Sequence, residues 1–180
     1  MPKVLPAALL VTMIVPAAPS PRPEMPVTHL ESRRLRARAV YVGKVSAVRR
    51  LGGLDGLSGE NQGRMEATID VVKALRVPTA TAAPAEVRIQ FDRRAPEPEG
   101  DGFYALATGE GVLVFADSFE PAYPLELLHG PRPVVTAQVK ALRDYVAAMD
   151  AGGMRLHGLT PATRTSQVRL YDEALAVLAK

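Results

Sequence analysis

The chain has 180 residues and a formal net charge of +3, and 47% of its residues are hydrophobic against 23% charged. This length suits one domain with a sizeable core, and so small a positive charge does not by itself indicate a nucleic-acid-binding protein. The chain contains no cysteine. Disulfides, thiolate metal sites and cysteine-linked lipids are therefore excluded, and stability must come from packing.

Residues 1–20 have the pattern of a signal peptide. Lys3 precedes the apolar stretch Val4–Val15, which is too short for a membrane span and is followed by small residues and prolines. We expect cleavage within residues 18–25, which would place the mature protein outside the cytoplasm, secreted or periplasmic. Because a clean Ala-x-Ala site is missing, an uncleaved interfacial anchor or a plain apolar tail is the alternative.

Residues 21–36 are expected to form a linker and a short helix. Ser20–Pro26 is proline-rich and should be extended, and Thr28 and Glu31 have the spacing of a capping box. In this helix Leu30 and Leu35 should face the core, while four arginines should lie mostly in solvent: Arg33, Arg34, Arg36 and Arg38. The arginines are interpreted as a solvated face, with a docking patch for an acidic partner or lipid head groups as the alternative.

The stretch Gly102–Ser118 organises the rest of the chain. A tight turn at Gly109–Gly111 leads into the apolar run Val112–Ala116, which is typical of a buried strand. Further strands are predicted at Ala39–Val48, Met65–Leu75 and Glu86–Asp92, with a short one near Leu125–Leu128. The glycine-rich loop Leu51–Gly63 should join the first two strands into a long hairpin.

Within these strands the pattern predicts which side chains face inward. Met65, Ala67, Ile69 and Val71 should share one face, opposite Glu66, Thr68 and Asp70, and Val87, Ile89 and Phe91 should point inward against Arg88 and Gln90. Gly43, in the middle of the first strand, is expected to mark a bulge, a sharp bend or a close backbone approach.

Two helices are predicted after the strands. Val134–Asp150 carries apolar residues near helical spacing and should end at Gly152–Gly153. Thr160–Pro161 is typical of an N-cap followed by proline, and it should start an additional C-terminal helix within residues 151–180. The apolar positions are Val135, Val139, Leu142, Val146 and Met149 in the first helix, and Val168, Leu170, Tyr171, Leu175 and Leu178 in the second.

The expected fold is mainly β with flanking helices, an α+β protein built on a small closed barrel of the OB-fold type with C-terminal helices. Four segments carry a resemblance to a known family: ARAVYVGKVSAV at 37–48, MEATIDVVKAL at 65–75, EVRIQF at 86–91 and FYALATGEGVLVFA at 103–116. They resemble the netrin-like module, the OB-fold barrel of the tissue inhibitors of metalloproteinases and their bacterial relatives. The resemblance covers residues 37–150.

This resemblance implies the barrel but no inhibitory residue. The eukaryotic inhibitors bind the protease zinc through an N-terminal cysteine that disulfides hold in place, whereas this chain has no cysteine and a proline-rich N-terminal region.

The residues offer no recognisable catalytic constellation. The histidines His29, His129 and His157 have no other histidine or carboxylate at metal-ligand spacing and are interpreted as surface or capping residues. Ser58 falls short of a nucleophile elbow and is interpreted as a turn residue. The loop glycines Gly52, Gly53, Gly56 and Gly59 lack the Gly-Lys-Ser/Thr end of a phosphate loop.

Carboxylates and aromatic residues also have structural interpretations. The loop residues Glu97, Glu99 and Asp101 are interpreted as a solvated loop rather than a calcium site, and Glu66 and Asp70 as residues that keep one face of a strand wet. Tyr41, Phe91, Phe103 and Phe115 are expected in the core rather than on a surface that stacks bases.

We therefore predict a secreted or periplasmic, non-catalytic binding protein of the netrin-like type, acting as a protease inhibitor or an envelope interaction module. No catalytic, cofactor-binding or metal-binding residue is predicted, and no cofactor. The expected partner is another protein rather than nucleic acid, with no membrane span beyond the signal segment. An OB-fold nucleic-acid-binding module is the alternative, and an enzyme of unrecognised type comes third.

Overall fold

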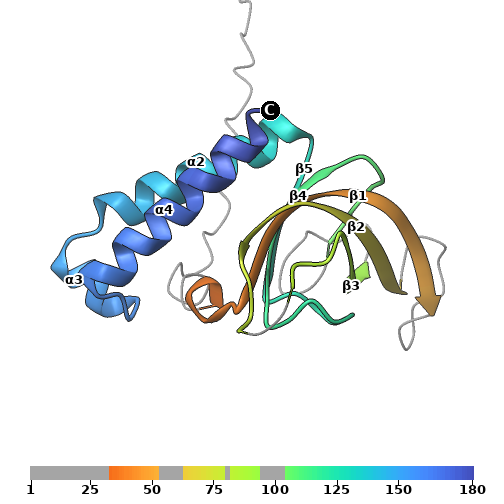
Figure 1. Cartoon of the computed structure of the whole chain (residues 1–180), viewed down its shortest axis with the longest axis horizontal. Coiled ribbons are helices and arrows are strands. Elements are labelled where there is room, and N and C mark those ends of the chain that lie inside the picture. Colours follow the sequence, from red (N-terminus) through yellow and green to blue (C-terminus); the bar gives the residue numbers. More distant parts are fainter. Residues whose placement is uncertain (1–32, 53–62, 80–81, 94–103) are drawn as a thin grey trace, which may run out of the picture.

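The fold combines a five-stranded antiparallel sheet with helices that follow it in the chain (Figure 1). The computed structural model describes residues 33–52, 63–79, 82–93 and 104–180. The strands are β1 (Ala39–Gly52), β2 (Gly63–Arg76), β3 (Glu86–Arg93), β4 (Gly111–Ala116) and β5 (Glu126–Gly130), and the helices are α2 (Arg132–Ala148), α3 (Ala151–Leu156) and α4 (Pro161–Leu178). The expected signal segment 1–20, most of the linker 21–36 and the capping pair Thr28 and Glu31 lie outside the described residues.

The sheet arches but does not close. Its strand order is β3-β2-β1-β4-β5, so β1 lies at the centre and β3 and β5 are the edges. One parallel bridge links Ile89 of β3 to Ala122, in the connection between β4 and β5. Pro121 precedes Ala122 and Pro124 follows two residues after it, and neither has an N–H to donate to a longer ladder. The α+β class with C-terminal helices is confirmed, but the sheet is open where a closed barrel was expected.

Strand β4 and the first part of β1, Ala39–Gly43, are buried on both faces. Alternate residues of each strand point to opposite sides of the sheet. One set faces the inner core within the arch: Ala39, Tyr41, Val112 and Val114. The other set faces the outer core between the sheet and the helices: Val40, Val42, Leu113 and Phe115. Near-continuous apolar runs in both strands follow from this double burial.

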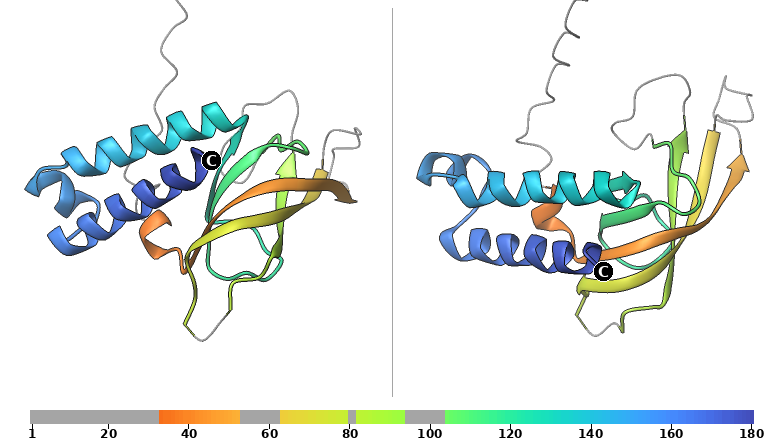
Figure 2. Two further views of the ribbon diagram at one scale, coloured as in Figure 1. Left: turned by 45° about the horizontal axis from the view of Figure 1, so that its top comes forward. Right: turned by 90° about the horizontal axis from the view of Figure 1, so that it is seen from above.

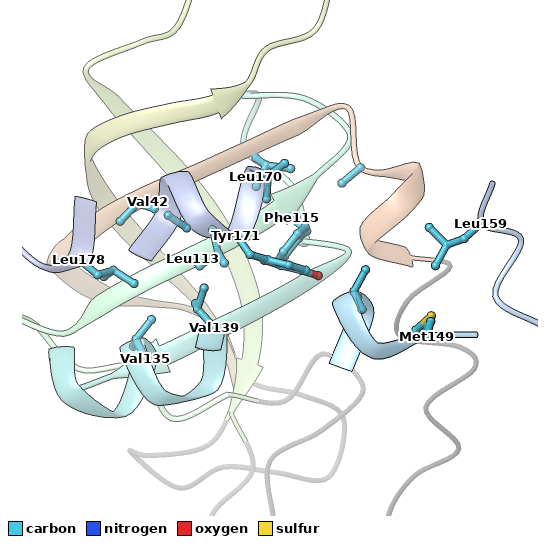
Figure 3. Packing of buried hydrophobic residues seen from close by; sticks show 14 residues of the cluster. Val42, Leu113, Phe115, Val135, Val139, Met149, Leu159, Leu170, Tyr171 and Leu178 are labelled. Carbon is cyan, nitrogen blue, oxygen red and sulfur yellow. The ribbon is translucent and has the colours of Figure 1, made fainter. Parts of the chain in front are cut away.

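The helices α2 and α4 lie antiparallel to one another and pack one end of the pair on the sheet, α2 against β5 and β4 and α4 against β2 and β1. Short helix α3 connects them beyond the edge of the sheet (Figure 2). Tyr171 of α4 is fully buried, and its ring lies beside Phe115 of β4 in Figure 3. Val135 and Val139 bring α2 onto the same core. This packing gives the helices their stability, because an amphipathic helix gains more from its buried face than from intrinsic propensity.

The predicted start of α4 is confirmed, but the predicted end of α2 is wrong. Thr160 caps α4 by accepting a hydrogen bond from the N–H of Thr163 at 3.1 Å, and proline follows it as predicted. Gly152 and Gly153 do not end α2, because they lie inside α3. The chain instead turns at Met149, and the Asp150 side chain caps α3 by accepting from the Gly153 N–H at 2.7 Å.

The alternation of inward-facing and outward-facing side chains predicted for β2 and β3 is confirmed. Met65, Ala67, Ile69, Val87, Ile89 and Phe91 are buried in the inner core. β1 and β2 pair antiparallel as the expected hairpin, although β1 continues past Val48 to Gly52. One prediction on the opposite face is wrong: Glu66 does not keep that face wet, because it is 5% exposed and paired with Arg49 at 2.7 Å.

Gly43 marks both a bulge and a close backbone approach, as predicted. Val42 pairs with Lys73 while Gly43 pairs with Val71, so Val72 is an extra residue in β2 at this point. A Cβ atom on Gly43 would lie 2.4 Å from Ile69 Cγ2 and 2.7 Å from the carbonyl oxygen of Asp70. Only glycine lets the two strands meet here without displacing backbone.

Replacing Gly43 with alanine should therefore destabilise the fold by about 1–3 kcal/mol, the usual cost of overpacking. Urea-induced unfolding followed by circular dichroism measures the effect. Gly52→Ala is the matched control, because a Cβ atom there has no neighbour within 4 Å. Equal unfolding free energies for the two variants would show that the close approach at Gly43 is not required.

Candidate functional site

The predicted basic cluster divides into buried and exposed arginines. Arg34 is 3% exposed and forms a buried ion pair with Glu126 at the start of β5, whereas Arg36 and Arg38 are exposed. The expectation that Arg34 lies in solvent is therefore wrong. Leu35 packs against the outer core, as predicted. This ion pair fastens the helical turn at 33–36 to the sheet, so Arg34 contributes to the fold rather than to a docking patch.

A second arginine holds the same segment from the other side. The Arg76 guanidinium, at the end of β2, donates to the carbonyl oxygen of Ala37 at 2.7 Å and to Gln167 Oε1 at 3.3 Å. Gln167 is buried in α4 and donates in turn to the Tyr171 hydroxyl at 3.0 Å. Burial lowers the pKa of Arg76 below its usual value, while Tyr171 acts in the opposite direction. These bonds connect the 33–37 segment, β2 and α4, which supports a structural role for this network.

His129 forms a contact that the sequence spacing does not reveal. Its Nδ1 lies 3.0 Å from Glu110 Oε2, because the β4–β5 ladder sets His129 opposite Val112 and Glu110 stands two residues before Val112. The same carboxylate oxygen accepts a hydrogen bond from the Ala107 N–H at 3.1 Å, and the Tyr104 ring meets the imidazole edge-on. A carboxylate that orients a histidine is part of many catalytic sites. Here it also closes the 107–110 turn onto β5, which is a structural role.

The other predicted candidates have structural roles or lie outside the described residues. His157 is buried, with its Nε2 2.9 Å from the Tyr145 hydroxyl at the far end of the helical pair. His29, Ser58, Gly53, Gly56, Gly59, Glu97, Glu99, Asp101 and Phe103 lie outside the described residues. Within the ranges that the structure describes, no three His, Asp or Glu side chains gather as a metal site.

Tyr41, Phe91 and Phe115 are each fully buried, which confirms them as core residues. Tyr41 lies in the inner core with its ring centroid 5.7 Å from that of Phe119. Its hydroxyl has no hydrogen-bond partner among the described residues. Burial raises the pKa of this phenol well above its ordinary value.

The strongest candidate for a binding site is a groove on the outer face, which we call the Val72 groove. It lies where α2 begins and α4 ends, above the bulge at Gly43, and has a volume of about 240 Å³. The residues that line it are Val42, Gly43, Lys44, Val72, Gly109, Gly111, Arg132, Val177 and Leu178. Sequence reasoning identified the bulge but not the groove, because the groove needs the helix ends as walls.

The groove combines an apolar floor with a basic rim. Val72 is 64% exposed, while Val42 and Leu178 beside it are almost completely buried. Lys44 and Arg132 are exposed, and among the described residues neither takes part in an ion pair. Asp70 is opposite Lys44 in the β1–β2 ladder, but no ion pair joins their side chains. No acidic residue lines the groove, so its net charge is positive.

Compared with known proteins, the chain matches no family model and no curated protein. The resemblance to the netrin-like module therefore stays a prediction. Among the helices in the described part of the chain, none is both long and apolar enough to span a membrane.

Breaking the Arg34–Glu126 pair should destabilise the protein. Arg34→Met or Glu126→Leu alone should cost about 3–5 kcal/mol, because each leaves a buried charge without its main partner, while the double variant should recover most of that loss. Urea unfolding of the four proteins gives the coupling free energy. Arg38→Met is the control and should change the unfolding free energy by less than about 0.5 kcal/mol, since Arg38 is exposed. Additive effects in the cycle would contradict the pairing.

Tyr41 should make the fold sensitive to alkaline pH. The unfolded chain loses the phenol proton near pH 10, whereas the folded chain keeps it to higher pH, so stability from this group falls as the pH rises above about 10. Tyr41→Phe should stabilise the protein by about 1 kcal/mol at about pH 8 by removing a buried hydroxyl, and its advantage should grow towards about pH 11. Urea unfolding at both pH values tests this, and a variant that is less stable at both would contradict it.

Proposed function

We propose that the chain is an exported, non-catalytic protein-binding domain of the netrin-like type, with an OB-type barrel that its short fifth strand leaves partly open. The strand order and the bridge between Ile89 and Ala122 support the barrel assignment. The OB-fold is itself a partly open five-stranded barrel. The central strand β1 pairs with both β2 and β4, so it is shared by the two halves of the arch.

The Val72 groove is the observation that carries a binding function. An aliphatic side chain that is 64% exposed lies beside two cations that have no ion-pair partner among the described residues. Exposed apolar surface bordered by polar groups is typical of protein interaction sites. Val134, in the first turn of α2, is 46% exposed and adds to the apolar surface near this end of the helices.

The nucleic-acid alternative receives less support. Single-strand binding by an OB barrel relies on aromatic side chains that are exposed for base stacking. In the described strands Tyr41, Phe91 and Phe115 are fully buried instead. The outer face of β2 and β3 mixes Arg64 and Arg88 with acidic residues, so it does not form a basic stripe.

Site-specific photo-crosslinking in the native cells tests the proposal. A benzophenone amino acid at position 72 should give a discrete protein adduct, and the same group at exposed position 140 on α2 should not. Cell fractionation and N-terminal sequencing of the purified chain should find it outside the cytoplasm, cleaved within residues 18–25. A cytoplasmic chain with an intact N-terminus and an adduct to nucleic acid would favour the alternative, and turnover of a substrate by the purified protein would contradict the proposal.

A further inference from the structure

The Val72 groove is produced by a specific distortion of the sheet. In β1, Val42 pairs with Lys73 and the next residue, Gly43, pairs with Val71. Val72 of β2 therefore has no partner in β1. A bulge re-aims the side chain of its extra residue, and bulges are frequent near functional sites. Here the bulge places Val72 beside Val177 and Leu178 at the end of α4. The exposed valine therefore results from the strand geometry itself.

The size of the groove indicates what kind of ligand it can hold. Its volume is about 240 Å³. Sites for small-molecule ligands usually enclose about 300–1,000 Å³ and bury most of the ligand. A smaller, open groove instead suits one or two side chains that project from a larger partner.

The charge of the groove indicates the chemistry of those side chains. Lys44 and Arg132 both line it, and neither has an ion-pair partner among the described residues. The start of α2 adds positive partial charge, since Pro131 offers no side-chain cap and the first turn has no acidic residue. The floor is aliphatic, from Val42, Val72 and Val177. A carboxylate next to an aliphatic group complements this combination.

We propose that the Val72 groove binds a segment of another protein in which an aspartate or glutamate neighbours a branched aliphatic residue, an inference that rests on the proposed protein-binding function. The aliphatic side chain packs on Val72 and Val177, and the carboxylate lies near Lys44 and Arg132. Val72 is the position where the apolar contact is made, and the two cations determine the preference for acidic partners.

Selection from a random peptide-display library against the full chain tests this inference. The expected outcome is enrichment of peptides that place Asp or Glu beside Leu, Ile or Val. The best synthetic peptide should bind with an affinity that falls as salt rises from about 0.05 to about 0.5 M, because exposed charges are screened. Replacing its acidic residue with the corresponding amide should weaken binding at least about tenfold.

Variants of the groove then locate the binding site. Lys44→Ala and Arg132→Ala should each weaken peptide binding about two- to fivefold, as expected for exposed ion pairs. The double variant K44E/R132E should weaken it at least about tenfold, because it places like charges against the carboxylate. Val72→Ser should also weaken it. Lys140→Glu on the exposed face of α2 is the control and should bind normally. Unchanged urea midpoints ensure that lost binding does not reflect unfolding.

Three outcomes would overturn the inference. Selected peptides that bind the K44E/R132E variant as well as the original chain would place binding elsewhere, while leaving a protein-binding function intact. Enrichment of apolar peptides without acidic residues, or a selection that enriches no peptide, would contradict the preference for acidic partners. The photo-adduct at position 72 would then decide separately whether the chain binds a protein. Binding of dodecanoate, or a dimer in light scattering that K44E/R132E abolishes, would assign the groove to a lipid or to a second copy.

Discussion

Strand β4 and the first part of β1 are buried on both faces, and this double burial is the constraint on which the rest of the structure depends. Side chains on one face fill the arch, and those on the other require a cover, which α2 and α4 provide. If the helices were absent, Val40, Val42, Leu113 and Phe115 would expose a continuous apolar surface to water. The helical pair is therefore part of the same folding unit as the sheet.

The bulge opposite Gly43 lies where the helices stop covering β1. β1 must cross the full width of the arch, covered by helices up to Val42 and open beyond Lys44. The bulge at Val72 changes the local twist at that boundary, as bulges generally do. The buried Arg34 and the half-buried Arg76 hold the other end of the sheet in place, since they join the incoming chain to β5 and α4.

Short-range patterns in the sequence predicted the positions of strands and the start of a helix, which depend on neighbouring residues. Alternation located β2 and β3, the apolar run located β4, and Thr160–Pro161 located the start of α4. The errors came from contacts between distant residues. Arg34 has the same local context as Arg36 and Arg38, and its burial depends on Glu126, which is 92 positions away. The contact between His129 and Glu110 likewise depends on how β4 and β5 pair. The open edge between β3 and β5 also involves residues far apart in the sequence.

The position of the Val72 groove follows from the lengths of these elements. α4 ends at Leu178 and α2 begins at Arg132, and these two helix ends lie above the same part of the sheet, near the bulge at Gly43. A straight β1–β2 ladder would give Val72 a partner opposite it. The groove therefore combines the bulge in β2 with the ends of the two helices. Lys44 and Arg132 line the groove and are exposed, and in our proposal these cations favour an acidic partner.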